Sequence, residues 1–191
     1  MMPGLGVDFD NTLICYDGLF HRAAREQGLV PDSTPATKEA VRDHLRSTGR
    51  EELWTELQGV VYGSRIGEAE PFPGALDCLA EAIRTGVPVS IISHKTRHPY
   101  RGTPVDLHAA ALGWLEAQGC FDPSRLALPR SRVHFLLTKE EKVAQVARCG
   151  CSHFVDDLPE ILLSPAFPAA TARLLFAPAG APALAGDPRL T

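Results

Sequence analysis

The first apolar run of the chain leads into "GVDFDNTLI", Gly6–Ile14, where two carboxylates stand close together. Asp8 and Asp10 are separated by one residue at the end of this run, and Thr12 follows. Like charges so close together repel, and burying them costs free energy. We therefore expect a positive charge to lie beside them in the folded protein.

Five short apolar runs, bounded by turn or helix residues, are typical of buried strands. They are Gly4–Phe9, Val87–Ser93, Arg132–Leu137, Ser152–Asp156 and Ala172–Pro178. Helical patterns over residues 74–86, 105–119 and 139–150 alternate with the later runs, the last helix starting with Thr138 and Glu141 as a capping box. Near-continuous apolar strands suit a parallel sheet covered on both faces. This alternation predicts an α/β fold with a doubly wound, five-stranded parallel sheet.

One long segment interrupts the alternation. Residues 15–72 show helical patterns, with turns at Ser33–Pro35 and in "EAEPFPG". We therefore expect an α/β core formed by residues 1–14 and 73–191, and a small helical insertion formed by residues 15–72. The tail after Pro178 is rich in Ala, Pro and Gly, and we expect it to be poorly ordered.

Composition excludes several classes of protein. The chain has 191 residues, 45% of them hydrophobic and 22% charged, which is ordinary for a soluble globular protein. A net charge of −4 does not suggest nucleic-acid binding. No apolar run approaches the roughly 20 residues of a membrane span, and the N-terminus does not resemble a secretory signal. The five scattered cysteines favour a reduced, cytoplasmic setting.

In open α/β sheets, ligands bind beyond the carboxyl ends of the strands, and polar side chains follow three of the predicted strands. Lys142, in the first turn of the helix before the fourth strand, would add an ammonium group. Clustered carboxylates repel unless a cation compensates them, and all-oxygen ligands favour Mg²⁺. We therefore expect a Mg²⁺ and phosphate site at this edge. The residues at the three strand ends are Asp8, Asp10, Thr12, Ser93, His94, Lys95, Asp156 and Asp157.

These residues resemble the four ordered motifs of the haloacid dehalogenase superfamily. "DFDNT", Asp8–Thr12, resembles motif one, Asp-x-Asp-x-Thr, and "IIS", Ile91–Ser93, resembles motif two. Lys142, 14 residues before Asp156, fits motif three, and "FVDD", Phe154–Asp157, resembles motif four. The resemblance spans residues 4–178, and residues 15–72 occupy the position of that superfamily's C1-type cap.

The resemblance implies a role for each residue. Asp8 would be the nucleophile that forms an aspartyl-phosphate, and Asp10 the general acid and base. Phosphatases of the superfamily keep this second aspartate, whereas its dehalogenases lack it. Mg²⁺ is expected on Asp8, the backbone carbonyl of Asp10 and Asp156, with Asp157 helping directly or through a water. The residues expected to bind phosphate are Thr12, Ser93, His94 and Lys142.

Each residue also has an ordinary structural interpretation. Asp8 and Asp10 could form a solvated strand end, and Asp156–Asp157 could cap the helix of "LPEIL". Ser93 could be a turn hydroxyl. Lys139 is a rival to Lys142 as the site lysine, and either could be a solvated helix charge.

Three further features have two interpretations each. The loop "SHKTRHPYRG", Ser93–Gly102, could be a basic surface that grips an anionic substrate or a solvated loop, with His94 and His98 as metal ligands a weaker possibility. Cys149-x-Cys151 could bind metal, although burial near a helix end is favoured. Trp54 and Tyr62 could line a pocket in the insertion or belong to its core.

Together, these patterns predict a Mg²⁺-dependent phosphatase that acts on a small phosphorylated metabolite, such as a sugar phosphate or a nucleoside monophosphate. A phosphotransferase or mutase that excludes water is one alternative. A non-catalytic protein that binds a phosphorylated ligand is another, although it would not need both Asp8 and Asp10. We expect neither a nucleic-acid partner nor a membrane partner.

Overall fold

The computed structural model describes residues 3–178, 180 and 187–191. Contacts between Cα atoms divide the chain into two compact units, one of residues 1–13, 72–95 and 120–191 and one of residues 14–71 and 96–119. The second unit thus also contains residues 96–119, and the assignment of residues 15–72 as a cap domain stays a prediction. Much of the tail after Pro178, expected to be poorly ordered, lies outside the described residues.

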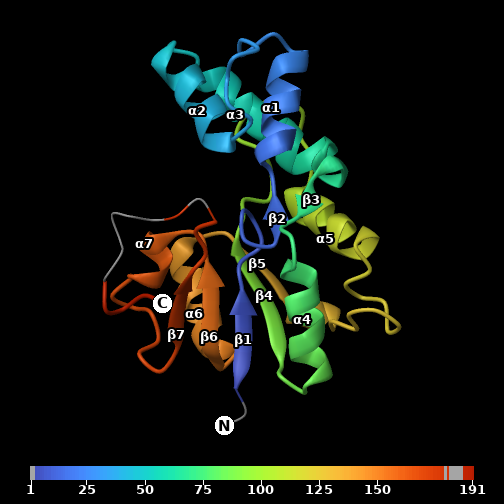
Figure 1. Cartoon of the computed structure of the whole chain (residues 1–191), viewed down its shortest axis with the longest axis vertical. Coiled ribbons are helices and arrows are strands. Elements are labelled where there is room, and N and C mark those ends of the chain that lie inside the picture. Colours follow the sequence, from blue (N-terminus) through green and yellow to red (C-terminus); the bar gives the residue numbers. More distant parts are fainter. Residues whose placement is uncertain (1–2, 179, 181–186) are drawn as a thin grey trace. The chain divides into compact units, whose positions relative to one another are not determined.

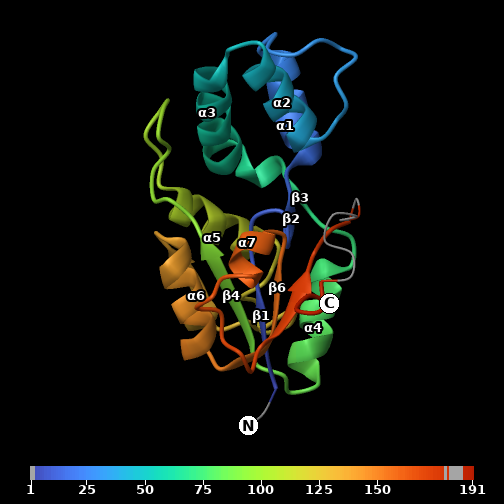
Figure 2. The ribbon, with the colours of Figure 1, turned by 90° about the vertical axis from the view of Figure 1, so that its left-hand side faces the viewer.

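The first unit contains a five-stranded parallel sheet with the order β5-β4-β1-β6-β7 (Figure 1). Figure 2 shows helix α4 on one side of this sheet and helix α6 on the other. The predicted doubly wound α/β fold is therefore confirmed. The strands are β1 (Gly4–Val7), β4 (Val89–His94), β5 (Val133–Leu136), β6 (Cys151–Asp156) and β7 (Ala172–Leu175), and the helices are α4 (Ala75–Arg84), α6 (Lys139–Arg148) and α7 (Pro159–Leu162), with a 3₁₀ turn at Arg130–Arg132.

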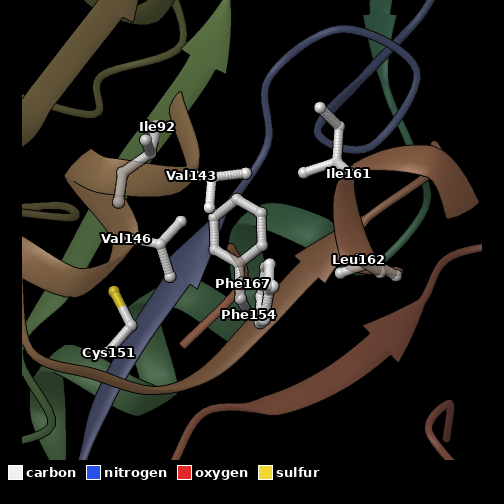
Figure 3. Close-up of a cluster of buried hydrophobic side chains, with 8 residues drawn as sticks. All are labelled: Ile92, Val143, Val146, Cys151, Phe154, Ile161, Leu162 and Phe167. Carbon is white, nitrogen blue, oxygen red and sulfur yellow. The ribbon is translucent and has the colours of Figure 1, made fainter. Parts of the chain in front are cut away.

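A buried hydrophobic cluster joins the sheet to α6 and α7 (Figure 3). Strands β4 and β6 contribute Ile92 and Phe154, both fully buried, and α6 contributes Val143 and Val146 from one face. Burying apolar side chains of this size is the main favourable term in folding. The cluster therefore holds α6 against the sheet. Its members are Ile92, Val143, Val146, Cys151, Phe154, Ile161, Leu162 and Phe167.

The predicted capping box fixes the start of α6. The Thr138 hydroxyl accepts from the Glu141 backbone N–H at 3.1 Å, and the Glu141 carboxylate accepts from the Thr138 N–H at 3.1 Å. Together these bonds satisfy donors that a helix start leaves open. Because the helix begins at Lys139, Lys142 falls in its first turn.

The second unit is mainly helical and has an aromatic core. Trp54 is buried and packs on Phe20 with ring centroids 4.9 Å apart, while Tyr62 contacts Tyr16 at 4.8 Å. Tyr62 also borders a cavity of about 100 Å³. Trp54 is therefore a core residue, whereas Tyr62 both packs in the core and lines this cavity. The elements are α1 (Asp17–Glu26), α2 (Lys38–Ser47), α3 (Glu51–Gly59), α5 (Leu107–Ala117), a π-helical turn (Val60–Ser64), a 3₁₀ turn (Ile66–Glu68) and the antiparallel pair β2 (Ile14–Cys15) and β3 (Glu70–Pro71).

The cysteines of Cys149-x-Cys151 are structural in this fold. Cys151 is buried in the hydrophobic cluster, and burial raises the pKa of its thiol to about 11. The sulfur of Cys149 lies 3.6 Å from Nε2 of His134. Within the described part of the chain, neither cysteine belongs to a group of side chains that could hold a metal ion. No helix among residues 3–178, 180 and 187–191 is long and apolar enough to cross a membrane.

Gly6 in the central strand leaves no room for a side chain, which generates a stability prediction. A Cβ atom there would lie 2.6 Å from Cδ2 of the buried Phe154 ring and 2.7 Å from the Cys151 sulfur. We expect Gly6→Ala to lower the free energy of unfolding by about 1–3 kcal/mol, measured by urea denaturation. As a control, Gly113→Ala in α5 meets no atom within 4 Å and should raise or leave unchanged the stability. Equal effects of both substitutions would contradict the prediction.

Candidate active site

The carboxyl ends of β1, β4 and β6 meet at one edge of the sheet. Val7, the last residue of β1, is in register with Ile91 of β4 and Val155 of β6. The Asp8 N–H donates to the Val155 carbonyl at 2.9 Å, which continues the pairing past the end of β1. Because the strands are parallel, the side chains that end them converge on this edge, as the sequence predicts.

A tight turn after β1 brings Thr12 back to Asp8. Asn11 has a left-handed backbone with φ 59°, a conformation that asparagine tolerates better than most residues. The Leu13 N–H then donates to the Phe9 carbonyl at 3.1 Å. Thr12 is buried, and its hydroxyl donates to Oδ2 of Asp8 at 3.5 Å. The turn thus places a hydroxyl beside the Asp8 carboxylate.

Lys142 provides the positive charge that the buried carboxylates require. Its side chain is 1% exposed, and its Nζ lies 2.7 Å from Oδ1 of Asp8 and 2.6 Å from Oδ2 of Asp156. Burial by itself would lower the pKa of Lys142, but the charges of the two aspartates outweigh burial and the net shift is upward. Lys142 therefore stays protonated between the two carboxylates.

The rival lysine, Lys139, lies elsewhere. It forms an exposed ion pair with Glu160 on the surface of the first unit. Exposed pairs of this kind contribute little to stability. Of the two lysines, Lys142 is the one at the carboxylate edge.

Three carboxylates form a group that fits a divalent cation. Asp8, Asp156 and Asp157 each offer one oxygen, and these oxygens lie within 4.8 Å of one another. Asp8 and Asp156 are buried, and Asp157 is half-buried. The donors are all oxygen, and so few protein ligands would leave room for water and phosphate oxygens, as Mg²⁺ prefers. The residues present therefore fit Mg²⁺, whose binding stays a prediction.

The pKa of Asp156 is raised in this buried group of carboxylates. Burial raises the pKa of its carboxyl to about 7, the charge of Asp8 acts in the same direction, and Lys142 opposes both. Its Oδ1 accepts from the Leu158 N–H at 3.0 Å, so Asp156 also supports the turn into α7. Leu158 is the N-cap residue of α7, and this helix has no side-chain capping hydrogen bond. The alternative that Asp156–Asp157 cap this helix is therefore wrong, and the role of Asp156 in a metal site stays a prediction.

Asp10 lies outside the group of three carboxylates. Its Oδ1 and Oδ2 accept from Nζ of Lys95 at 2.8 and 2.9 Å. The Asp10 side chain is 19% exposed, compared with 4% for Lys95. The predicted contact of Asp10 with the metal was through its backbone carbonyl, and it stays a prediction.

Ser93 and His94 end β4 in different environments. Ser93 is buried at the strand end, whereas the His94 ring places Nε2 3.1 Å from the Leu137 carbonyl. The structure thus ties His94 to the loop after β5, and its predicted contact with phosphate remains to be tested.

In the loop beyond Lys95, the charged and polar side chains contact carboxylates and a carbonyl of the second unit. Arg97 pairs with Asp106, and Arg101 pairs with Glu52. Nδ1 of His98 lies 3.2 Å from the Val105 carbonyl. The loop thus has structural partners within the second unit, and its grip on an anionic substrate stays a prediction.

Lys95 is the residue at this edge to which the sequence pattern assigned no role. The pattern placed it after the second predicted strand, within the basic loop Ser93–Gly102, and did not match it to Asp10. Strand periodicity offered an indication, because Lys95 is two residues beyond Ser93 and would face the same side if the chain stays extended.

The raised pKa of Asp156 generates a prediction about pH. An acid whose pKa is higher in the folded than in the unfolded state adds stability below its unfolded pKa and loses it as pH rises through the folded value. Without metal, wild type should thus lose stability relative to Asp156→Asn between about pH 4 and 7, by an amount on the order of a few kcal/mol. Urea denaturation with a chelator present measures this difference.

The matched control for this prediction is Asp77→Asn, which alters an exposed aspartate of α4. Its difference from wild type should stay flat with pH. A flat difference for Asp156→Asn as well would show that this carboxyl is not perturbed.

Solved structures share this fold over most of the chain. A dehalogenase matches with a TM-score of 0.56 and 16% identity, covering 95% of this chain and 87% of that one. A haloacid dehalogenase-like hydrolase from Xanthomonas campestris matches with 0.55 and 13%, covering 99% and 89%. A HAD-superfamily hydrolase from Ehrlichia chaffeensis matches with 0.54 and 13%, covering 92% and 88%. No family model and no curated protein matches the sequence. At such identities the likeness concerns the fold, and the chain has the α/β fold of haloacid dehalogenase superfamily hydrolases.

Proposed function

We propose that this protein is a Mg²⁺-dependent phosphatase that hydrolyses a small phosphorylated metabolite through an aspartyl-phosphate on Asp8. The observation that carries the proposal is the separation of two neighbouring carboxylates. Asp8 belongs to the group with Lys142, Asp156 and Asp157, whereas Asp10 is held apart by Lys95. One carboxylate can thus act as a nucleophile while the other transfers protons.

In the first step, an oxygen of Asp8 attacks phosphorus as the bond from phosphorus to the leaving oxygen breaks. Asp10 enters this step as the carboxylic acid, with one oxygen protonated. It gives that proton to the leaving oxygen, and the alcohol departs. Lys142 holds a fixed positive charge beside Asp8, and Thr12 and Ser93 offer hydroxyls at the same edge. A bound Mg²⁺ would neutralise the negative charge of the phosphoryl group.

In the second step, Asp10, now ionised, takes a proton from water, whose oxygen attacks the phosphorus of the aspartyl-phosphate. The bond from phosphorus to the Asp8 oxygen breaks, which frees inorganic phosphate and restores the carboxylate. The same residue thus acts first as acid and then as base, and the cycle leaves both aspartates ready for another substrate.

Asp10 favours phosphatase over dehalogenase chemistry, although several of the similar structures are described as dehalogenases. A dehalogenase expels halide, which needs no proton from the enzyme, so it gains nothing from an acid at this position. In this chain the position holds a carboxylate fixed by a buried lysine. By the resemblance, this second aspartate is the one that phosphatases keep.

Several assays separate this proposal from its alternatives. Hydrolysis of p-nitrophenyl phosphate that needs Mg²⁺ would support the phosphatase, and a panel of sugar phosphates and nucleoside monophosphates would identify the substrate class. Exchange of phosphate between substrates without net release would favour a mutase. Turnover of a 2-haloacid alone would favour a dehalogenase, and ligand binding without turnover would favour a binding protein.

Asp8→Asn tests the nucleophile. An amide does not attack phosphorus, so phosphate release should fall below about one hundredth of wild type while circular dichroism stays unchanged. Lys139→Met, at the exposed ion pair with Glu160, is the control and should keep wild-type activity. Residual activity of Asp8→Asn above that limit would contradict the assignment.

Asp10→Asn tests the acid and base. An alkyl phosphate expels a basic alkoxide that needs a proton, whereas p-nitrophenyl phosphate expels a stable phenolate that needs it far less. We expect a loss of roughly 10²–10⁴-fold in aspartyl-phosphate formation, largest for the alkyl ester.

Breakdown of the intermediate should slow in the same variant, because its water would lack a base. Phosphorylated Asp8 should therefore accumulate with p-nitrophenyl phosphate, visible by intact mass and as a burst of phenolate. Equal slowing of both esters without a trapped adduct would mean that Asp10 acts only through the metal or the loop.

A further inference from the structure

Lys95 is a buried cation one residue past the end of β4. Its backbone N–H donates to the Leu136 carbonyl at 2.8 Å, which continues the pairing of β4 with β5 by one residue. Its side chain is 4% exposed. An ammonium group buried to this extent is costly unless a negative group compensates it. The fold thus places Lys95 where a partner is required.

That partner is the Asp10 carboxylate, and the contact involves both of its oxygens. Nζ of Lys95 lies 2.8 Å from Oδ1 and 2.9 Å from Oδ2. The same ammonium lies 5.6 Å from the centroid of the Phe9 ring, a favourable distance for a cation and an aromatic face. A donor that contacts both oxygens restricts the rotation of the carboxylate. The Lys95 contact therefore fixes the orientation of the Asp10 side chain.

Asp10 is close in the chain to Asp8, which has its own cation, so the contact with Lys95 affects which cation Asp10 approaches. Asp10 follows Asp8 by two residues, and Lys142 with Asp156 occupies the space around Asp8. A carboxylate two residues from Asp8 in the chain, without a cation of its own, would be drawn toward Lys142 or toward a cation bound by the three carboxylates. Lys95 supplies a competing positive charge, which keeps the Asp10 carboxylate out of that group.

We infer that Lys95 is the positioning residue of the reaction: it holds the Asp10 carboxylate away from the metal-binding carboxylates and in the orientation for proton transfer to the leaving oxygen. This inference rests on the proposed function. It differs from a role in phosphate binding, in which Lys95 would contact the phosphoryl group directly and its removal would weaken binding whether or not Asp10 is present.

A double-mutant cycle with two esters tests the inference. Lys95→Met keeps the length of the side chain and removes its charge. We expect it to lower kcat for an alkyl phosphate about tenfold more than kcat for p-nitrophenyl phosphate, as loss of a positioned acid would. In the Asp10→Asn background, Lys95→Met should change kcat less than about twofold, because there is no longer an acid to position. Lys139→Met is the matched lysine control.

Two further measurements keep the test decisive. Lys95→Gln, which retains a donor, should recover part of the selective loss, and it carries the test if urea denaturation shows that Lys95→Met is unfolded. Losses that are equal for both esters, or that add fully to those of Asp10→Asn, would overturn the positioning role. A wild-type protein that hydrolyses neither ester would contradict the proposed function itself and remove this inference with it. Normal wild-type turnover with additive losses would overturn the inference alone.

Discussion

The buried ammonium of Lys142 is the interaction on which the sheet edge depends. Asp8, directly after β1, and Asp156, at the end of β6, converge where these parallel strands end, and both are almost fully buried. Without a cation between them, their repulsion in a medium of low dielectric constant would oppose folding. Lys142 reaches them because the capping box fixes the start of α6 and the hydrophobic cluster holds this helix against β4 and β6. Local helix chemistry and core packing thus combine to place one charge.

Three carboxylates and one ammonium meet at this edge of the sheet. One ammonium faces Asp8 and Asp156, with the Asp157 carboxylate close by. Burial, together with the charge of Asp8, raises the pKa of the Asp156 carboxyl to about 7. A structural ion pair would gain from exact neutrality, whereas an edge that receives a cation gains from unsatisfied oxygens. The arrangement is thus poised for a further positive ligand.

Two neighbouring carboxylates have different lysine partners. Lys142 contacts Asp8 and Lys95 contacts Asp10, so carboxylates two residues apart in the chain occupy different electrostatic environments. Pairs of acids in distinct environments are how one site provides both a nucleophile and a proton donor. The similar solved structures establish the fold at identities of 13–16%, while the chemistry proposed for this chain rests on its own side chains.

The sequence by itself determined the strands, the α/β class and the edge at which Asp8, Ser93 and Asp156 meet, because apolar periodicity and strand ends are local properties. It also indicated the start of α6 through Thr138 and Glu141. It did not choose firmly between Lys139 and Lys142, since residues three apart on a helix lie near the same face.

Tertiary structure made that choice by burying Lys142 against two strands and leaving Lys139 at the surface. It also selected Lys95, from a loop with several cations, as the partner of Asp10, 85 residues away in the chain. Such a pairing depends on which strands lie side by side and on which charges the packing removes from water, and no local pattern contains that information.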